Sequence, residues 1–248
     1  MKKHAVVTGG GSGIGAAVAK RLLADGLRVT LMGRSLERLR STQAALGDVA
    51  VQACDVGDEA SVAAAFAAVG DVDVLVNNAG QVETAPLAKT SLEVWQRLLN
   101  VNLTGSFLCS RAVLPGMLAR RDGRIVNVAS TAALKGYAYV AAYCAAKHGV
   151  LGLTRALALE VAAKGVTVNA VCPGYTETDI VAGAIANIVA KTGRSEQEAR
   201  AALAKVNPMQ RLVTPEEVAD AILWLASEGA SSINGQAVAV AGGEVFTG

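Results

Sequence analysis

The chain has 248 residues, of which 52% are hydrophobic, 4% aromatic and 18% charged, with a formal net charge of +2 at pH 7. This length suffices for one large core, and no Pro-, Gly- or Ser-rich linker divides the sequence, so we expect a single domain over residues 1–248. The basic residues are scattered and form no stripe, which argues against a nucleic-acid partner.

The cysteines are typical of a reducing compartment. Cys54, Cys109, Cys144 and Cys172 lie far apart in apolar stretches without Cys-x-x-Cys or Cys/His ligand spacing, so we expect buried free thiols, no metal site and a cytoplasmic protein. Residues 1–4 lead directly into a strand-like run and leave no room for a signal peptide. No stretch is long and uncharged enough to cross a bilayer, so no membrane association is expected.

Short β-branched runs alternate with longer helical patterns along the chain. Strands are predicted at residues 5–8, 28–32, 49–53, 72–76, 124–129, 166–172 and 236–240, the last after a helix at 215–226. Strands that are apolar almost throughout are expected where both faces of a sheet are covered. The pattern therefore predicts an α/β fold with a doubly wound parallel sheet, the Rossmann fold, connected by right-handed crossovers.

A glycine-rich loop, Thr-Gly-Gly-Gly-Ser-Gly-Ile-Gly at residues 8–15, lies between the first strand and the first helix. Backbone N–H groups and the positive end of a helix can hold a pyrophosphate there, and glycines permit its close approach. The alternative is a flexible turn without a ligand. The nucleotide-binding residues predicted in this loop are Gly9, Ser12, Gly13, Ile14 and Gly15.

The end of the second strand predicts which dinucleotide binds. An acidic residue there would accept hydrogen bonds from the ribose of NAD, whereas a basic residue would pair with the 2′-phosphate of NADP. The chain has Gly33-Arg34-Ser35 without a carboxylate, and Arg34 can bind phosphate in bidentate fashion. We therefore expect NADP, with NAD as the alternative if Arg34 is a solvated residue that only stacks on adenine.

The ends of the third and fourth strands carry further candidates, because ligands of open parallel sheets bind at the carboxyl ends of strands. Asp55, followed by Val56, can accept a hydrogen bond from the adenine amino group. The stretch Asn77-Asn78-Ala79-Gly80 follows the fourth strand and contributes Asn78, Ala79 and Gly80. A purely structural turn, in which the asparagines bond their own backbone, is an equally good interpretation of this stretch.

The reacting group is predicted at the end of the fifth strand and on the helix that follows. Ser130 ends that strand, and Tyr143 and Lys147 are four residues apart, so they share one face of the helix. We expect the lysine cation and an oxidised nicotinamide ring to lower the pKa of the tyrosine, which is ordinarily about 10. Ser130 can then hold a carbonyl oxygen while Tyr143 passes the proton.

Two other features belong to this part of the fold. Asn102 lies within a helical pattern, where asparagine is unfavourable, and could hold a water molecule in a proton relay behind the lysine. Residues 178–206 carry two helical patterns, 180–191 and 196–205, with no strand between them. Such an insertion near the carboxyl ends of the strands is placed to cover the ligand crevice.

With these motifs the chain resembles the short-chain dehydrogenase/reductase family over essentially its whole length. The resemblance implies that Tyr143 is the acid-base, that Lys147 also holds the nicotinamide ribose and that Asn102 completes a water relay. It further implies cofactor contacts in the segment after the sixth strand. The residues of this segment that match the family are Pro173, Gly174, Thr176 and Thr178.

Among subgroups, the chain is similar to 3-oxoacyl thioester reductases, 3-hydroxybutyrate-type dehydrogenases and aromatic polyketide ketoreductases. The resemblance implies a homotetramer formed through the last strand and the helix before it. Arg124 and Lys164 match positions at which carrier-protein reductases have basic residues that can meet an acidic partner. An equally good interpretation is that both residues belong to ordinary solvated turns. Relatives that prefer NADP often carry a second basic residue in the glycine loop, whereas Gly11 and Ser12 are neutral here.

The sequence therefore predicts an oxidoreductase that moves hydride between NADP(H) and a ketone or secondary alcohol. The expected substrate is a 3-oxoacyl group on CoA or a carrier protein, or a related β-keto compound. One alternative is an NAD-linked dehydrogenase of a hydroxyacyl-CoA or of a cyclic or aryl secondary alcohol. A second alternative is a nucleotide-sensing binding protein without activity, against which the complete set of Asn102, Ser130, Tyr143 and Lys147 argues.

Overall fold

The computed structural model describes residues 2–246, so residues 1, 247 and 248 of the expected domain lie outside the described residues. One parallel sheet has its strands in the order β3-β2-β1-β4-β5-β6-β7. The strands are β1 (His4–Thr8), β2 (Arg28–Gly33), β3 (Val49–Ala53), β4 (Val74–Asn77), β5 (Gly123–Val128), β6 (Val166–Pro173) and β7 (Ala237–Val240). All predicted strands are present, with ends that differ by up to two residues.

The helices between the strands complete the doubly wound arrangement that the sequence predicts. They are α1 (Gly13–Ala24), α2 (Leu36–Leu46), α3 (Glu59–Val69), α4 (Leu92–Leu99), α5 (Gly105–Arg120), α6 (Ala141–Val161), α7 (Asp179–Thr192), α8 (Glu196–Ala204) and α9 (Pro215–Ala226). A π-helical turn, η2 (Asn100–Thr104), joins α4 to α5. The short 3-10 helices are η1 (Leu87–Lys89), η3 (Thr131–Ala133), η4 (Ala162–Lys164) and η5 (Glu228–Ala230).

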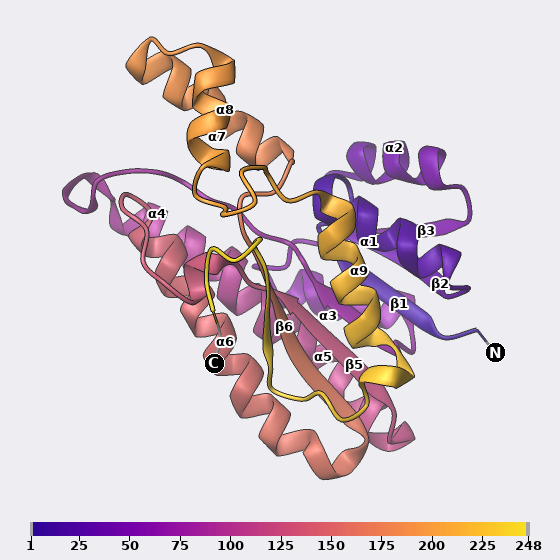
Figure 1. Ribbon diagram of the computed structural model, residues 1–248. Coiled ribbons are helices and arrows are strands. Elements are labelled where there is room, and N and C mark those ends of the chain that lie inside the picture. Colours follow the sequence, from indigo (N-terminus) through magenta and orange to yellow (C-terminus); the bar gives the residue numbers. More distant parts are fainter. Residues whose placement is uncertain (1, 247–248) are drawn as a thin grey trace.

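Helices cover both faces of the sheet (Figure 1). On one face, α1, α2 and α9 bury apolar side chains such as Leu22, Leu39 and Ile222 against the strands. On the other face, α3 and α5 bury Phe66 and Met117, together with residues of α6. Because apolar side chains cover both sides, the strands are apolar almost throughout, as the sequence pattern indicates.

The sheet reverses its winding at β1, which places the ligand crevice. β1 pairs in parallel with β2 on one side and with β4 on the other, so the chain leaves β1 and β4 in opposite directions. The carboxyl ends of these strands form the topological switch point at which ligands of open α/β sheets bind. The residues that follow β1, β2, β3 and β4 therefore surround one crevice.

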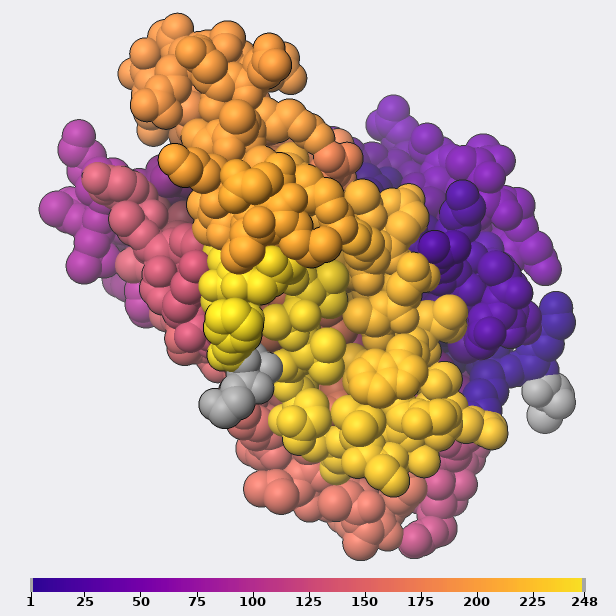
Figure 2. All heavy atoms as spheres, viewed as in Figure 1, coloured from indigo at the N-terminus to yellow at the C-terminus, as the bar shows by residue number. Residues whose placement is uncertain are grey.

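The helical insertion is present, and α7 and α8 project beyond the sheet as a separate pair (Figures 1 and 2). They bury a small apolar cluster between them, formed by Val181, Ile185 and Ala199 together with Leu212 from the segment before α9. The pair follows β6 at its carboxyl end, on the same edge of the sheet as the crevice.

The cysteines are free thiols, and Cys54, Cys109 and Cys172 are buried as expected. Cys144 is only half-buried, so the expectation of burial is wrong for this residue. Over residues 2–246, no helix combines the length and the hydropathy that a membrane span requires.

Candidate active site

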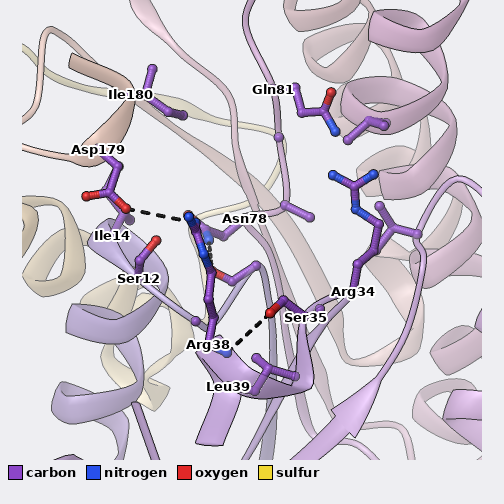
Figure 3. A pocket seen from close by; sticks show the side chains of 18 of the residues that line it. Ser12, Ile14, Arg34, Ser35, Arg38, Leu39, Asn78, Gln81, Asp179 and Ile180 are labelled. Atoms are coloured by element: carbon purple, nitrogen blue, oxygen red, sulfur yellow. Dashed lines mark hydrogen bonds and ion pairs between the residues drawn. The ribbon is translucent and has the colours of Figure 1, made fainter. Parts of the chain in front are cut away.

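A cavity of about 640 Å³ opens at the carboxyl ends of β1 to β4 (Figure 3). Its volume lies within the usual range for small-molecule and cofactor sites. Most of the residues predicted to bind the cofactor line it. They are Gly9, Ser12, Gly13, Ile14, Arg34, Asp55, Val56, Asn78, Ala79, Gly80 and Thr178.

The glycine loop has the geometry of a phosphate cradle. Gly9 and Gly13 have φ values of +64° and +52°, which L side chains rarely adopt. Ser12 precedes α1 in extended conformation and makes no side-chain cap, so its hydroxyl does not take up the first N–H groups of the helix. Free helical N–H groups and the positive end of the helix suit a pyrophosphate.

Gly15 has a different role from the other glycines of the loop. It does not line the cavity, but a Cβ on it would lie 2.3 Å from the carbonyl oxygen of Gly9. Glycine is therefore required for the close packing of α1 on the loop rather than for contact with a ligand.

Asn78 combines the two roles that the sequence left open. It lines the cavity, and its Nδ2 donates to the carbonyl oxygens of Thr8 and Gly9 at 3.0 and 3.1 Å. The Thr8 hydroxyl oxygen in turn accepts from the backbone N–H groups of Asn78 and Ala79, each at 3.0 Å. The end of β4 thus fixes the shape of the glycine loop.

The part of the cavity next to the ends of β2 and β3 carries Arg34 and Asp55. Asp55 Oδ1 accepts from the N–H of Gly57 at 3.0 Å, which orients the carboxylate and leaves Oδ2 for a ligand. Arg34 is exposed, and within the described residues its guanidinium has no ion-pair partner. In Figure 3 its side chain extends into the cavity toward Gln81.

Part of the cavity wall is formed by residues that no sequence motif marks as binding residues. Arg38 on α2 carried no motif, and its neighbours across the cavity come from the start of α7. Only their positions in the fold bring these residues to the site. The missed lining residues are Gly11, Gly33, Ser35, Arg38, Leu39, Cys54, Gln81, Val101, Asp179 and Ile180.

Ser130, Tyr143 and Lys147 meet outside the cavity lining. The Ser130 side chain lies close enough to the Tyr143 hydroxyl to act on its pKa, and its own Oγ accepts from the backbone N–H of Ala132 at 3.1 Å. Lys147 Nζ donates to the carbonyl oxygen of Val128 at 2.8 Å and lies 5.6 Å from the centroid of the Tyr143 ring. The predicted convergence of the three side chains is therefore present.

The pKa values of this group differ from the expectation. Burial raises the pKa of Tyr143 to about 12, although the Ser130 side chain opposes the rise. Burial also lowers the pKa of Lys147 to about 8, because a charged ammonium is disfavoured away from water. Desolvation therefore moves the pKa of Tyr143 in the direction opposite to the lowering that was expected from Lys147.

Asn102 is fully buried in the π-helical turn. Its Nδ2 donates to the carbonyl oxygens of Gln81 and Leu98 at 2.8 and 2.9 Å, and its Oδ1 accepts from the N–H of Gln81 at 3.1 Å. The side-chain amide therefore binds the chain after β4 to η2, and both of its donors are engaged. The side-chain amide of Asn102 therefore has no free N–H group to donate to the water molecule that the sequence suggested it could hold.

The end of β6 and the segment that follows it contribute fewer residues to the cavity lining than expected. Pro173, Gly174 and Thr176 do not line it, and only Thr178 does. The hydroxyl of the buried Thr176 donates to the carbonyl oxygen of Gly174 at 3.0 Å and so closes the turn after β6.

A switch-point cavity with a glycine cradle, next to a Ser/Tyr/Lys group, defines a dinucleotide-dependent oxidoreductase. The chain belongs to the short-chain dehydrogenase family, whose model matches residues 3–207. It is an NAD(P)-dependent enzyme that interconverts a ketone and a secondary alcohol.

Similar proteins cover nearly the whole chain. A putative ketoacyl reductase of Streptomyces coelicolor is 43% identical over 96% of this chain and 95% of its own length. A cis-4-hydroxycyclohexanecarboxylate dehydrogenase of Sinomonas cyclohexanicum is 44% identical over 98% of this chain and 96% of its own. The crystal structure of a single-residue variant of the actinorhodin polyketide ketoreductase with NADPH superposes with a TM-score of 0.93 at 42% identity, covering 98% of this chain and 97% of that one.

Proposed function

We propose that this protein is an NADPH-dependent ketoreductase whose preferred substrate is a β-keto compound, with residues 1–248 forming one catalytic domain. The observation that carries the proposal is the convergence of Ser130, Tyr143 and Lys147 beside a cavity of a size that suits a cofactor, with Lys147 Nζ 5.6 Å from the centroid of the Tyr143 ring. The two hydroxyl groups can both contact one carbonyl oxygen, which is the requirement for protonating it.

The cofactor would lie across the carboxyl ends of the strands. The cradle formed by Gly9, Ser12 and Gly13 would hold its pyrophosphate, and Asp55 would face its adenine. When bound, the cofactor supplies the hydride. Every other part of the reaction falls to the protein: orientation, exclusion of water and delivery of a proton.

In the reductive direction, Ser130 donates a hydrogen bond to the ketone oxygen and Tyr143 gives it a proton. A tyrosine pKa of about 12 keeps the hydroxyl protonated at neutral pH, which suits a proton donor. Lys147, with a pKa of about 8, is mostly cationic at pH 7 and stabilises the phenolate that remains. In the oxidative direction the same tyrosine, as phenolate, accepts the alcohol proton.

The NADP preference rests on Arg34, which follows β2 in place of a carboxylate and extends its guanidinium into the cavity. The relative that was crystallised with NADPH supports this choice. Binding of NAD is the alternative.

The substrate proposal draws on relatives that are named ketoacyl reductases. A second candidate is a cyclic secondary alcohol, because a cis-4-hydroxycyclohexanecarboxylate dehydrogenase shares a similar identity with this chain. The two candidates differ in cofactor and direction as well as in substrate, so one set of assays separates them.

A carrier protein remains a proposed partner, with one correction to the residues involved. Arg124 is only 8% exposed, because it lies inside the sheet near the start of β5. Its guanidinium forms an ion pair with Asp122. The expectation that Arg124 meets a carrier is therefore wrong. Lys164 is exposed at the end of η4 and stays available. The free thiols are consistent with the cytoplasmic location that we also propose.

The test is a parallel titration of the purified protein with NADPH and NADH, followed by absorbance decay after addition of acetoacetyl-CoA. Tighter binding of NADPH and rapid decay would support the ketoreductase. Tighter binding of NADH without decay would overturn it, and oxidation of 4-hydroxycyclohexanecarboxylate with NAD would then support the second candidate.

A further inference from the structure

A second guanidinium reaches the part of the cavity next to the ends of β2 and β3. Arg38 lies four residues after Arg34, in the first turn of α2, and its side chain extends along the cavity wall (Figure 3). Its NH1 lies 4.0 Å from Oδ2 of Asp179, the first residue of α7. The pair thus bridges the cavity between the end of β2 and the helical insertion.

The stem of Arg38 is fixed by its neighbours, whereas its head is exposed. A Cβ on Gly11 would lie 3.1 Å from the Cβ of Arg38, so the start of α2 packs directly on the glycine loop. The hydroxyl oxygen of Ser35 accepts from the backbone N–H of Arg38 at 3.3 Å and fixes the first turn of the helix. The side chain itself is 69% exposed, so its guanidinium can turn without disturbing the core.

Arg38 therefore places a positive charge beside the glycine loop, whose own residues Gly11 and Ser12 are neutral. The charge comes from α2 rather than from the loop. No local sequence pattern indicates it, because the contact depends on how α2 packs against the loop.

Asp179 competes for the same guanidinium. Its side chain is 75% exposed, and an exposed ion pair is worth little in water. A phosphate that binds Arg38 at hydrogen-bond distance has an advantage over Asp179, because it carries more charge and can accept from two N–H groups, whereas Asp179 approaches only NH1, at 4.0 Å. NAD has only hydroxyl groups at this position of the ribose, so it provides no comparable replacement for the carboxylate.

We propose that Arg38 is a cofactor-selecting residue, which exchanges Asp179 for the 2′-phosphate of NADP. Asp179 weakens NADP binding by holding Arg38 in the protein without cofactor. The inference rests on the proposed function, because it assigns a residue pair to the selectivity of the same site.

The test measures equilibrium binding of NADPH, NADH, 2′,5′-ADP and 5′-AMP by calorimetry, so it does not depend on turnover. Arg38→Gln should weaken binding of NADPH and 2′,5′-ADP about tenfold, the loss of one charge-assisted contact, and leave NADH and 5′-AMP unchanged. Arg40→Gln is the matched control, because Arg40 is an exposed arginine of the same helix that does not line the cavity. Equal affinities of the two variants for 2′,5′-ADP would overturn the proposal.

The role of Asp179 is tested by a double-mutant cycle. Asp179→Asn should strengthen 2′,5′-ADP binding about two- to threefold, and this gain should shrink in the Arg38→Gln background. A gain of the same size in both backgrounds would show that Asp179 acts on the phosphate directly, against the proposed exchange.

The two proposals fail differently. A wild-type protein that prefers NADH contradicts the NADPH-dependent function and the exchange together. A wild-type protein that prefers NADPH, with the preference intact in Arg38→Gln, contradicts only the exchange and leaves the phosphate to Arg34.

Discussion

At the scale of single residues, the site depends on two buried groups whose pKa values burial moves in opposite directions. Burial raises the pKa of Tyr143 and lowers that of Lys147, so desolvation favours the neutral form of both. The Ser130 side chain opposes the rise at Tyr143, and the charge of Cys172 opposes the fall at Lys147. Burial thus keeps the Tyr143 hydroxyl protonated at neutral pH, which is the form that the proposed proton donor requires.

Replacing Tyr143 with Phe should lower kcat for ketone reduction by a factor of about 100 to 10,000, because the proton donor is lost. Calorimetric affinity for NADPH should stay within about twofold of the wild type, since the ring remains. Tyr139→Phe serves as the control, because Tyr139 is 62% exposed. Turnover by Tyr143→Phe at the wild-type rate would exclude the tyrosine as the acid.

The buried lysine should be visible in the pH dependence of stability. The unfolded chain keeps the Lys147 proton up to about pH 10.5, whereas the folded protein releases it near pH 8. Between these values the unfolded state binds more protons, so Lys147 makes the free energy of unfolding rise with pH. Urea unfolding from pH 7.5 to 10 should show that the free energy of unfolding of the wild type, taken relative to that of Lys147→Met, rises with pH. The comparison cancels the opposite effect of the buried thiols, whose pKa values burial raises. Lys164→Met, at an exposed lysine, should keep the wild-type slope.

The residues that could be predicted at this scale are those with fixed spacings along the chain. Tyr143 and Lys147 share a helix face, and the glycines follow a strand, so local geometry is enough to place them. Arg38 and Asp179 could not be predicted, because they belong to different elements and meet only through the packing of α2 and α7. The burial that shifts the tyrosine pKa is likewise a property of the folded environment.

At the scale of elements, α9 begins with a well-defined cap. Thr214 and Glu217 form a capping box, and the Glu217 carboxylate also pairs with Arg211 at 2.6 Å. These contacts lower the pKa of Glu217 to about 2. Because α9 packs on α1 and the sheet, its start supports the face that carries the glycine loop.

Glu217→Gln should destabilise the protein by about 0.5–1 kcal/mol at pH 7, a small value because the carboxylate is 39% exposed and screened by solvent. The folded pKa is lower than the ordinary 4.5, so the contribution is present above pH 4.5 and is lost as the pH falls toward 2. The difference between the two proteins in chemical unfolding should therefore shrink at pH 3. Glu216→Gln, at an exposed residue of the same turn, should leave the free energy of unfolding unchanged at both pH 7 and pH 3.

The elements themselves were predictable because the apolar strands and helical patterns are long and regular. The order of the strands in the sheet was not, because it depends on contacts between segments far apart in the sequence. The π-helical turn was also outside sequence reasoning: Asn102 was assigned to a helix, whereas the hydrogen bonding there departs from the α-helix.

At the scale of the whole molecule, β7 and α9 form an edge that favours association. β7 ends the sheet with the apolar sequence Ala-Val-Ala-Val, all half-buried, and Trp224 on α9 is 46% exposed. An apolar edge strand is a site of strand or helix contact between chains unless it is covered. We propose that this edge carries the subunit contacts of a homotetramer.

Light scattering after size exclusion should give four times the mass of one chain for the wild type. Trp224→Glu should reduce the assembly to dimers or monomers, because a carboxylate would be buried in the contact. Leu87→Glu, at an apolar residue that is 68% exposed elsewhere on the surface, should leave the tetramer intact. A monomeric wild type, or a tetrameric Trp224→Glu, would contradict this assembly.

The π-helical turn at Asn100–Thr104 changes the phase of the segment from α4 to α5. A π-turn holds about one residue more than an α-helical turn of 3.6 residues, so the side chains of α5 lie about 100° away from the directions that a regular continuation of α4 would give them. Each helix can therefore present its own face to a different neighbour, although the backbone runs on without a break. Shortening the chain by one residue here would restore regular hydrogen bonding but rotate α4 relative to α5. The π-helical turn, which contains Asn102, thus lets one continuous helical segment pack on α6 through α4 and on α3 through α5.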